Sequence, residues 1–186
     1  MGCGCGKKAV GGTVHFMGRD GNTLTEPTEW GPILWKYLHT LAEKCGTSNN
    51  PITDADQAKC LEIMLGTLPL VVPCTECQGH AAAYLSANPL PSFTELRGDA
   101  LRSQAREWLF RFHNHVRSTK GQPIQLQTTE ECAAQYAQSF VPKCEYTAFI
   151  QAVAYAVRQG WVRIDHWRKW YSTSEKARLL IGNIVV

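Results

Sequence analysis

The sequence lacks several features that define other classes of protein. It has no apolar run approaching ~20 residues, so we expect no membrane-spanning helix. Its first eight residues contain no hydrophobic region, so we expect no secretory signal. The formal net charge is only +3, and Lys and Arg are scattered, which is not typical of nucleic-acid binding. Period-two alternation is also missing, apart from a short segment at 161–164, so the chain offers little to build a sheet.

The chain does contain eight cysteines, two of them in a Cys-x-x-Cys motif. Cys74 and Cys77 lie between an apolar run at 68–73 and a helical stretch that begins near Gln78. A helix N-terminus stabilises a thiolate, because its unpaired N–H groups and its dipole favour negative charge. The thiolate is the nucleophile of disulfide exchange. This placement therefore predicts a redox-active pair.

A Cys-x-x-Cys motif is also half of a zinc site. Zinc normally takes four protein ligands, and His80 is a third candidate beside Cys74 and Cys77. No second Cys-x-x-Cys exists to complete the set. The remaining cysteines are Cys3, Cys5, Cys45, Cys60, Cys132 and Cys144. At this point both a redox pair and a helical zinc-binding interaction module stay open.

Apolar residues recur at three-to-four spacing through most of the chain, which predicts an all-α fold. Thr28 is the expected N-cap of the first helix, because it follows Pro27 at the start of the first periodic segment. Glycine and proline mark several of the expected ends. We expect helices at about 28–45, 53–68, 78–88, 94–119, 132–140 and 146–157.

Two of these helices carry aromatic and imidazole groups on one face. Trp35 and His39 are four residues apart, and His113, Val116 and Arg117 share a stripe of the later helix. Such groups on facing helices suit a planar, hydrogen-bonding ring. The same residues in either segment alone also fit an ordinary packed core, so both interpretations remain.

Together and in this order, Trp-x-x-x-His, Cys-x-x-Cys and His-Asn-x-Val resemble the motifs of the Erv-type FAD-linked sulfhydryl oxidases. The resemblance extends over roughly residues 30–123. The segments WGPILWKYLHTLA, PCTECQGHAAAYLSANPL and FHNHV look most like the branch found in large cytoplasmic DNA viruses of iridovirus-like type. The family usually has Asn where this chain has Arg117, and often Leu-Gly-Lys-Pro where this chain has residues 120–123. An aromatic residue common after the first motif is replaced around Glu43 and Lys44.

The resemblance implies an all-α fold, an Erv-type four-helix bundle with additional C-terminal helices and with FAD held in the bundle. It divides the chain into three parts. Residues 1–25 would be a flexible tail containing Gly and Cys, residues 26–160 the sulfhydryl oxidase domain, and residues 161–186 a C-terminal extension of unknown role.

The function implied is that of a FAD-dependent thiol oxidase that makes disulfides in protein substrates. Electrons would pass from dithiols through Cys74–Cys77 to FAD and then to molecular oxygen, giving hydrogen peroxide. Cys74 would exchange with substrate, and Cys77 would lie against the flavin ring. No metal is implied. The residues expected to bind FAD are Gly31, Trp35, His39, Cys77, His113, Asn114, Val116 and Arg117.

Two further cysteine pairs and a set of partners follow from the same resemblance. Cys3 and Cys5 would form a shuttle pair on the flexible arm, and Cys132 and Cys144 a structural disulfide. The expected partners are viral protein dithiols, molecular oxygen and a second copy of the chain in a homodimer. The expected locations are the host cytoplasm and the virion. The alternative is a zinc-binding or structural virion interaction module without redox activity.

Overall fold

The computed structural model describes residues 26–182 and 184–186. This part of the chain forms seven α-helices and two 3-10 helices and has no strand, which confirms the predicted all-α fold. None of the helices it describes is long and apolar enough to cross a membrane. In chain order the elements are α1 (Pro27–Lys44), α2 (Pro51–Gly66), η1 (Leu68–Leu70), α3 (Thr75–Ala87), η2 (Phe93–Glu95), α4 (Gly98–Thr119), α5 (Thr129–Tyr136), α6 (Lys143–Arg158) and α7 (Ile164–Leu180).

The ends of the first helices follow from local chemistry. The N-cap of α1 is Glu26, so the prediction of Thr28 was wrong. Pro27 takes the first helical position, where its missing N–H costs nothing and its fixed φ suits the helix. After α1 comes Gly46 with φ +71°, and a Cβ there would collide with the Gly98 carbonyl. Glycine therefore lets the end of α1 approach the beginning of α4 closely.

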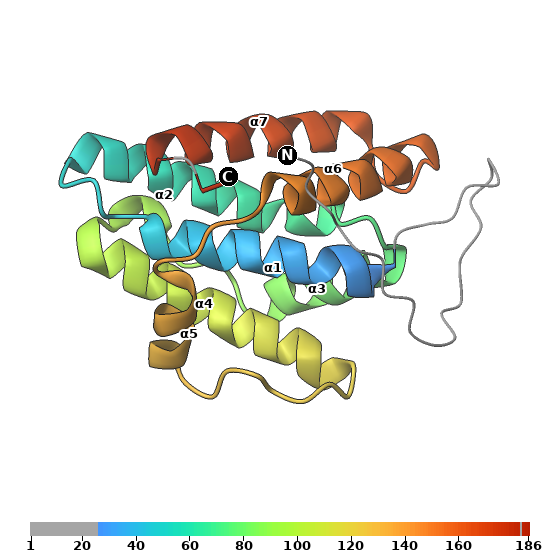
Figure 1. Cartoon of the computed structure of the whole chain (residues 1–186), viewed down its shortest axis with the longest axis horizontal. Helices are drawn as coiled ribbons and strands as arrows, with labels where there is room; N and C mark the ends of the chain where they lie inside the picture. Colours follow the sequence, from blue (N-terminus) through green and yellow to red (C-terminus); the bar gives the residue numbers. More distant parts are fainter. Residues whose placement is uncertain (1–25, 183) are drawn as a thin grey trace, which may run out of the picture.

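Helix α1 runs through the middle of the molecule (Figure 1). It contacts α4 and α5 on one side and α6 on another, and it carries many of the buried side chains of the core. Helix α3 lies beside η1 and also contacts α4. Helices α4, α5 and α6 therefore pack around α1, which is the central helix.

The C-terminal extension is packed into the fold. Helix α7 lies along α2, and Trp170 on it is fully buried, with its indole N–H donating to the Met64 carbonyl at 3.1 Å. The Ser174 hydroxyl shares hydrogen bonds with the Tyr37 hydroxyl at 2.8 Å and the Tyr146 hydroxyl at 3.0 Å. Residues of α1, α2, α6 and α7 therefore form one continuous interior.

The short segment with period-two alternation does not become a strand. Residues 161 and 162 form a bend, and Ile164 already belongs to α7. A segment this short is not held as a strand without a partner strand, and here it forms the connection between α6 and α7 instead.

Candidate functional site

The two cysteines of the motif lie at the N-terminus of α3, where the sequence predicted them. Cys74 is the N-cap, and its Sγ accepts a hydrogen bond from the Cys77 backbone N–H at 3.1 Å. Both thiols are free and half-buried. Gln78 secures this end of the helix, because its side-chain amide donates to the Val72 carbonyl at 3.0 Å and to the Trp161 carbonyl at 3.1 Å.

The two thiols differ strongly in acidity. Hydrogen bonding from the Cys77 thiol lowers the pKa of Cys74 from 9.0 to about 6, against the opposing effect of burial. The Cys77 backbone N–H and the Lys120 ammonium act in the same direction. The pKa of Cys77 is raised, because its proton is held by Cys74 and because the thiol is partly buried. In the reduced pair, Cys74 is therefore the thiol that ionises first.

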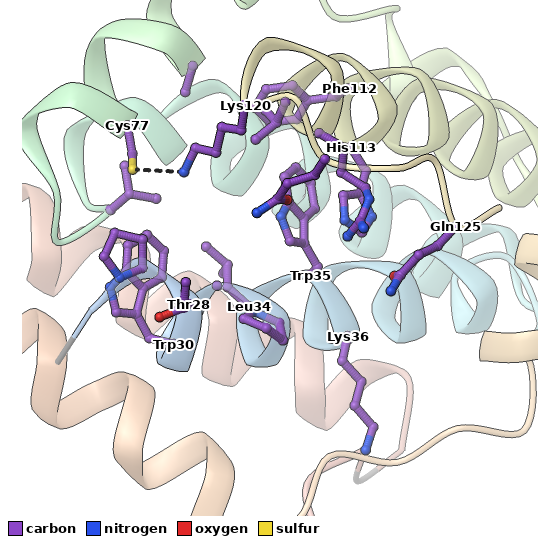
Figure 2. A pocket seen from close by; sticks show the side chains of 18 of the residues that line it. Thr28, Trp30, Leu34, Trp35, Lys36, Cys77, Phe112, His113, Lys120 and Gln125 are labelled. Carbon is purple, nitrogen blue, oxygen red and sulfur yellow. Dashed lines mark hydrogen bonds between the residues drawn. The ribbon is translucent and has the colours of Figure 1, made fainter. Parts of the chain in front are cut away.

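A cavity of about 950 Å³ opens beside Cys77 (Figure 2). Its wall combines aromatic rings, apolar side chains and a few cations, and Cys77 belongs to it whereas Cys74 does not. Figure 2 shows Trp30, Leu34 and Trp35 reaching it from α1. The lining residues are Pro27, Thr28, Trp30, Gly31, Pro32, Leu34, Trp35, Lys36, Leu68, Val72, Cys77, His80, Ala81, Phe112, His113, Val116, Arg117, Lys120, Gln122, Pro123, Gln125, Gln135, Tyr136 and Ser139.

Most of the residues predicted to bind a cofactor meet at this cavity. Those in its wall are Gly31, Trp35, Cys77, His113, Val116 and Arg117. The other two lie elsewhere. His39 is buried behind the wall, and Asn114 donates its side-chain amide to the Leu126 carbonyl at 3.3 Å, on the loop after α4. The structure therefore assembles six of the eight residues around one space.

His39 reaches the cavity wall through His113. The His113 ring stacks on Trp35, with centroids 4.2 Å apart and planes 9° apart. His39 Nε2 lies 3.1 Å from His113 Nδ1, and Cys132 Sγ lies 3.3 Å from His39 Nδ1. Burial and the neighbouring histidine lower the pKa of His39 to about 3. Burial and Arg117 lower that of His113 to about 4, so both rings are neutral near pH 7.

The direction of the hydrogen bonds that link Cys132, His39 and His113 follows from the acidity and basicity of these groups. Burial and the nearby Glu43 raise the pKa of Cys132 to about 12, so its thiol keeps its proton. An imidazole nitrogen is a better acceptor than a thiol sulfur. The assignment that satisfies both contacts has Cys132 donating to His39 and His39 donating to His113. His113 then carries its remaining N–H on Nε2.

The predicted disulfide between Cys132 and Cys144 is wrong for this structure, where both thiols are free. Cys132 is buried against His39, whereas Cys144 is exposed near the start of α6. A bridge needs the two Cβ atoms facing each other at close range, and these side chains have different surroundings. The predicted shuttle pair, Cys3 and Cys5, lies outside the described residues.

Several residues of the site were not predicted as cofactor-binding residues, although His80 was considered as a zinc ligand. Lys120 Nζ lies 3.8 Å from Cys77 Sγ, and the Tyr136 ring stacks on His39 at 4.7 Å. Trp30 Nε1 and His80 Nδ1 are buried without a hydrogen-bond partner, and both residues line the cavity. Lys120 belongs to residues 120–123, where the sequence departs from the family pattern. This departure was the only feature of the sequence that marked the residue.

The described residues contain no cluster of three or more His, Cys, Asp or Glu side chains arranged to hold a metal ion. His80 lines the cavity with Cys77, but no third ligand joins them in this part of the chain. Nothing in the described residues therefore favours the zinc-binding module.

The fold and the site together define a class: an all-α protein with a dithiol at a helix N-terminus, beside a large cavity walled by aromatic rings. Residues 32–141 match the profile of the Erv1/Alr family. The match covers more than half of the chain, and the chain belongs to this family. The predicted resemblance is thereby confirmed.

Proteins of large DNA viruses are similar to the chain. A FAD-linked sulfhydryl oxidase of African swine fever virus (isolate Pig/Kenya/KEN-50/1950) is 30% identical over 125 residues, which cover 66% of this chain and 94% of the relative. A putative FAD-linked sulfhydryl oxidase of Invertebrate iridescent virus 3 is 32% identical over 98 residues, or 53% of this chain and 60% of the relative. One of Invertebrate iridescent virus 6 is 28% identical, over 55% and 88%. No solved structure matches the chain.

Proposed function

We propose that the chain is a FAD-dependent thiol oxidase that makes disulfides in protein substrates. The observation that carries this proposal is the placement of Cys77 in the wall of the large aromatic cavity, with Cys74 just outside that wall. The Cys77 sulfur thus borders a space for a cofactor. Cys74 lies beside that space, at the N-terminus of α3. Relatives named FAD-linked sulfhydryl oxidases support the same function.

The cavity fits FAD in size and in chemistry. Its volume of about 950 Å³ lies near the upper end of the usual range for ligand pockets, ~300–1,000 Å³, as a dinucleotide requires. The stacked rings of Trp35 and His113 offer flat apolar surface. The unpartnered nitrogens of Trp30 and His80 would gain partners from a ligand with donors and acceptors. Arg117 offers a cation for a phosphate.

Bound FAD would supply the two-electron acceptor and pass the electrons to molecular oxygen, giving hydrogen peroxide. The chain's own residues carry out the disulfide exchange. A substrate thiolate attacks Cys74 Sγ of the oxidised pair, the Cys74–Cys77 bond breaks, and Cys77 leaves as a thiolate in the cavity wall. A second substrate thiol then attacks the mixed disulfide and releases Cys74. The position of Cys74 as the N-cap of α3 suits this last step, because the Cys77 backbone N–H and the helix N-terminus stabilise the departing Cys74 thiolate.

The proposal extends to partners and location. Viral relatives support protein dithiols of viral origin as substrates, with molecular oxygen as the final acceptor. The host cytoplasm and the virion are the proposed locations, and a homodimer the proposed assembly. Light scattering of the purified protein tests the assembly, and a monomer at micromolar concentration would contradict it.

The visible spectrum of the purified protein, with a thiol-oxidation assay on dithiothreitol, tests the function. The protein should be yellow and consume oxygen. Cys77→Ser should abolish oxidation but retain FAD. Cys74→Ser should also be inactive and should show a new long-wavelength band, because the Cys77 thiolate is then permanently free beside the ring. A band in Cys77→Ser alone would reverse the roles of the two sulfurs.

A colourless protein that gains no spectrum on addition of FAD and oxidises no thiol would contradict the proposed function. A metal assay on the same sample distinguishes the zinc module, which should contain stoichiometric zinc bound through Cys74 and Cys77. Release of that zinc by Cys74→Ser would then identify the motif as a metal site.

A further inference from the structure

A lysine at the end of α4 faces the sulfur of Cys77 across the cavity wall (Figure 2). Lys120 follows the last residue of α4, and its Nζ lies 3.8 Å from Cys77 Sγ. The lysine backbone N–H bonds the Val116 and Arg117 carbonyls at 3.3 and 3.2 Å. The base of this flexible side chain is therefore held by the helix end, within reach of the sulfur.

Among the described residues, no acidic side chain competes for this ammonium group. None of the ion pairs in this part of the chain includes Lys120, although several other cations are paired with carboxylates. The thiol of Cys77 is the hydrogen-bond partner of its Nζ. A cation beside a sulfur lowers the free energy of the thiolate relative to the thiol.

Lys120 is near both sulfurs, but the N-terminus of α3 stabilises negative charge on Cys74 more directly than on Cys77. Cys74 is the N-cap of α3 and receives the Cys77 backbone N–H, so the helix N-terminus serves Cys74. Cys77 lies one turn further along, where that field has weakened. The charged or titratable groups that act on Cys77 are Cys74 and Glu76 from the beginning of α3, which disfavour its thiolate, and Lys120 after α4, which favours it.

We propose that Lys120 is the residue that stabilises the Cys77 thiolate during disulfide exchange, a role that rests on the proposed oxidase function. When a substrate thiolate attacks Cys74 Sγ, a new S–S bond forms to Cys74 and the Cys74–Cys77 bond breaks. The electron pair of that bond stays on Cys77, whose new negative charge lies against the Lys120 ammonium. No proton has to be transferred in this step.

The mixed-disulfide state is where this contact matters most. Cys74 is then covalently bound and uncharged, so it no longer opposes ionisation of Cys77. Partial burial and Glu76 remain as the unfavourable influences, and Lys120 as the favourable one. A cation at this position therefore makes Cys77 a better leaving group and keeps it ionised at the cavity wall.

The test is the titration of Cys77 in a Cys74→Ala background, which resembles the mixed disulfide in having no second thiol. The purified protein is treated with iodoacetamide across about pH 5–10, and alkylation is measured at the Cys77 peptide by mass spectrometry, so other cysteines do not interfere. Lys120→Met should raise the apparent pKa of Cys77 by about one unit, a roughly tenfold loss of thiolate below the midpoint. Lys120→Arg should restore most of the thiolate.

Lys169→Met is the matched control, since Lys169 is an exposed residue of α7 and should leave the midpoint unchanged. The proposal would be overturned if the Cys77 alkylation midpoint were the same in the Cys74→Ala parent and in its Lys120→Met variant, with both proteins folded by circular dichroism. Lys120→Gln gives a second reading should the Met variant aggregate. The titration requires neither flavin nor oxygen. A protein that binds no FAD would therefore refute the oxidase function while leaving the effect of Lys120 on Cys77 measurable.

Discussion

The C-terminal helix is expected to be essential for stability, and Trp170→Ala tests this most directly. The Trp170 side chain is fully buried between α7 and the rest of the core. Its ring stacks on Trp167 at 5.7 Å and meets Phe149 edge-on at 6.0 Å. Its indole N–H donates to Met64 in the last turn of α2, just before the segment that leads into Cys74.

The expected magnitude follows from what the substitution removes. Truncation of a fully buried Trp forfeits its transfer free energy and leaves a cavity, which together cost ~3–5 kcal/mol. Domains of this kind have a total free energy of unfolding of ~5–15 kcal/mol, so the variant should lose a large fraction of its stability. Trp170→Phe should cost less, because it keeps a ring in the cavity and forfeits mainly the hydrogen bond, worth ~1 kcal/mol.

Urea unfolding followed by circular dichroism at fixed FAD concentration measures the effect. Tyr171→Ala is the matched control on the same helix: because Tyr171 is 38% exposed, this substitution should cost less than ~1 kcal/mol. If Trp170→Ala changed the free energy of unfolding no more than Tyr171→Ala, α7 would be a loosely attached appendage and the packing described above would be refuted. Should Trp170→Ala fail to fold, Trp170→Phe still gives a measurable midpoint.

Three further predictions concern the site. His113→Ala should weaken FAD binding more than His39→Ala, measured by fluorescence titration, because only the first of these rings lines the cavity; unchanged affinity in both would count against this cavity. In the reduced protein, alkylation of Cys74 should have its midpoint near pH 6, and a midpoint close to the ordinary value of 9.0 would contradict the assigned hydrogen bonds. Since that pKa is below 9.0, the thiolate stabilises the folded reduced form fully above pH 9, and this stabilisation is lost as the pH falls through about 6. Replacing Cys3 and Cys5 together by Ser should slow oxidation of protein dithiols much more than oxidation of dithiothreitol, and rates equal to those of the wild type on several protein dithiols would argue against a shuttle.

Six of the seven described α-helices were predicted near their observed positions because apolar periodicity reports burial directly, whereas α7 was not among the helices expected. The motif at the beginning of α3 and the stripe of His113, Val116 and Arg117 on α4 were located correctly for the same reason. The errors within the site arose at loops and at long-range contacts. Asn114 shares the motif of His113 but turns to the Leu126 carbonyl, and helical spacing alone gave no sign of this partner on the following loop.

Contacts between distant segments were the least predictable part of the site. Glu43 was noted only as a departure from a family pattern, yet its carboxylate is buried and makes two hydrogen bonds of 2.6 Å to Arg106 on α4. A buried carboxylate requires such a partner. Cys132 was assigned to a disulfide by resemblance to the family, whereas the fold places it against His39. Both outcomes depend on which helix faces α1, and no local pattern encodes that.

The Cys74–Cys77 dithiol is held in place partly by residues outside the segment that matches the family. That segment ends at residue 141, yet the Trp161 carbonyl beyond it accepts a hydrogen bond from Gln78, one residue after Cys77. Trp170 similarly holds the end of α2, from which the chain continues through η1 to Cys74. A helix N-terminus can tune a thiolate only if its orientation toward the cavity is fixed. The C-terminal part of the chain therefore contacts both the beginning of α3, which carries Cys74 and Cys77, and the end of α2, which leads into it.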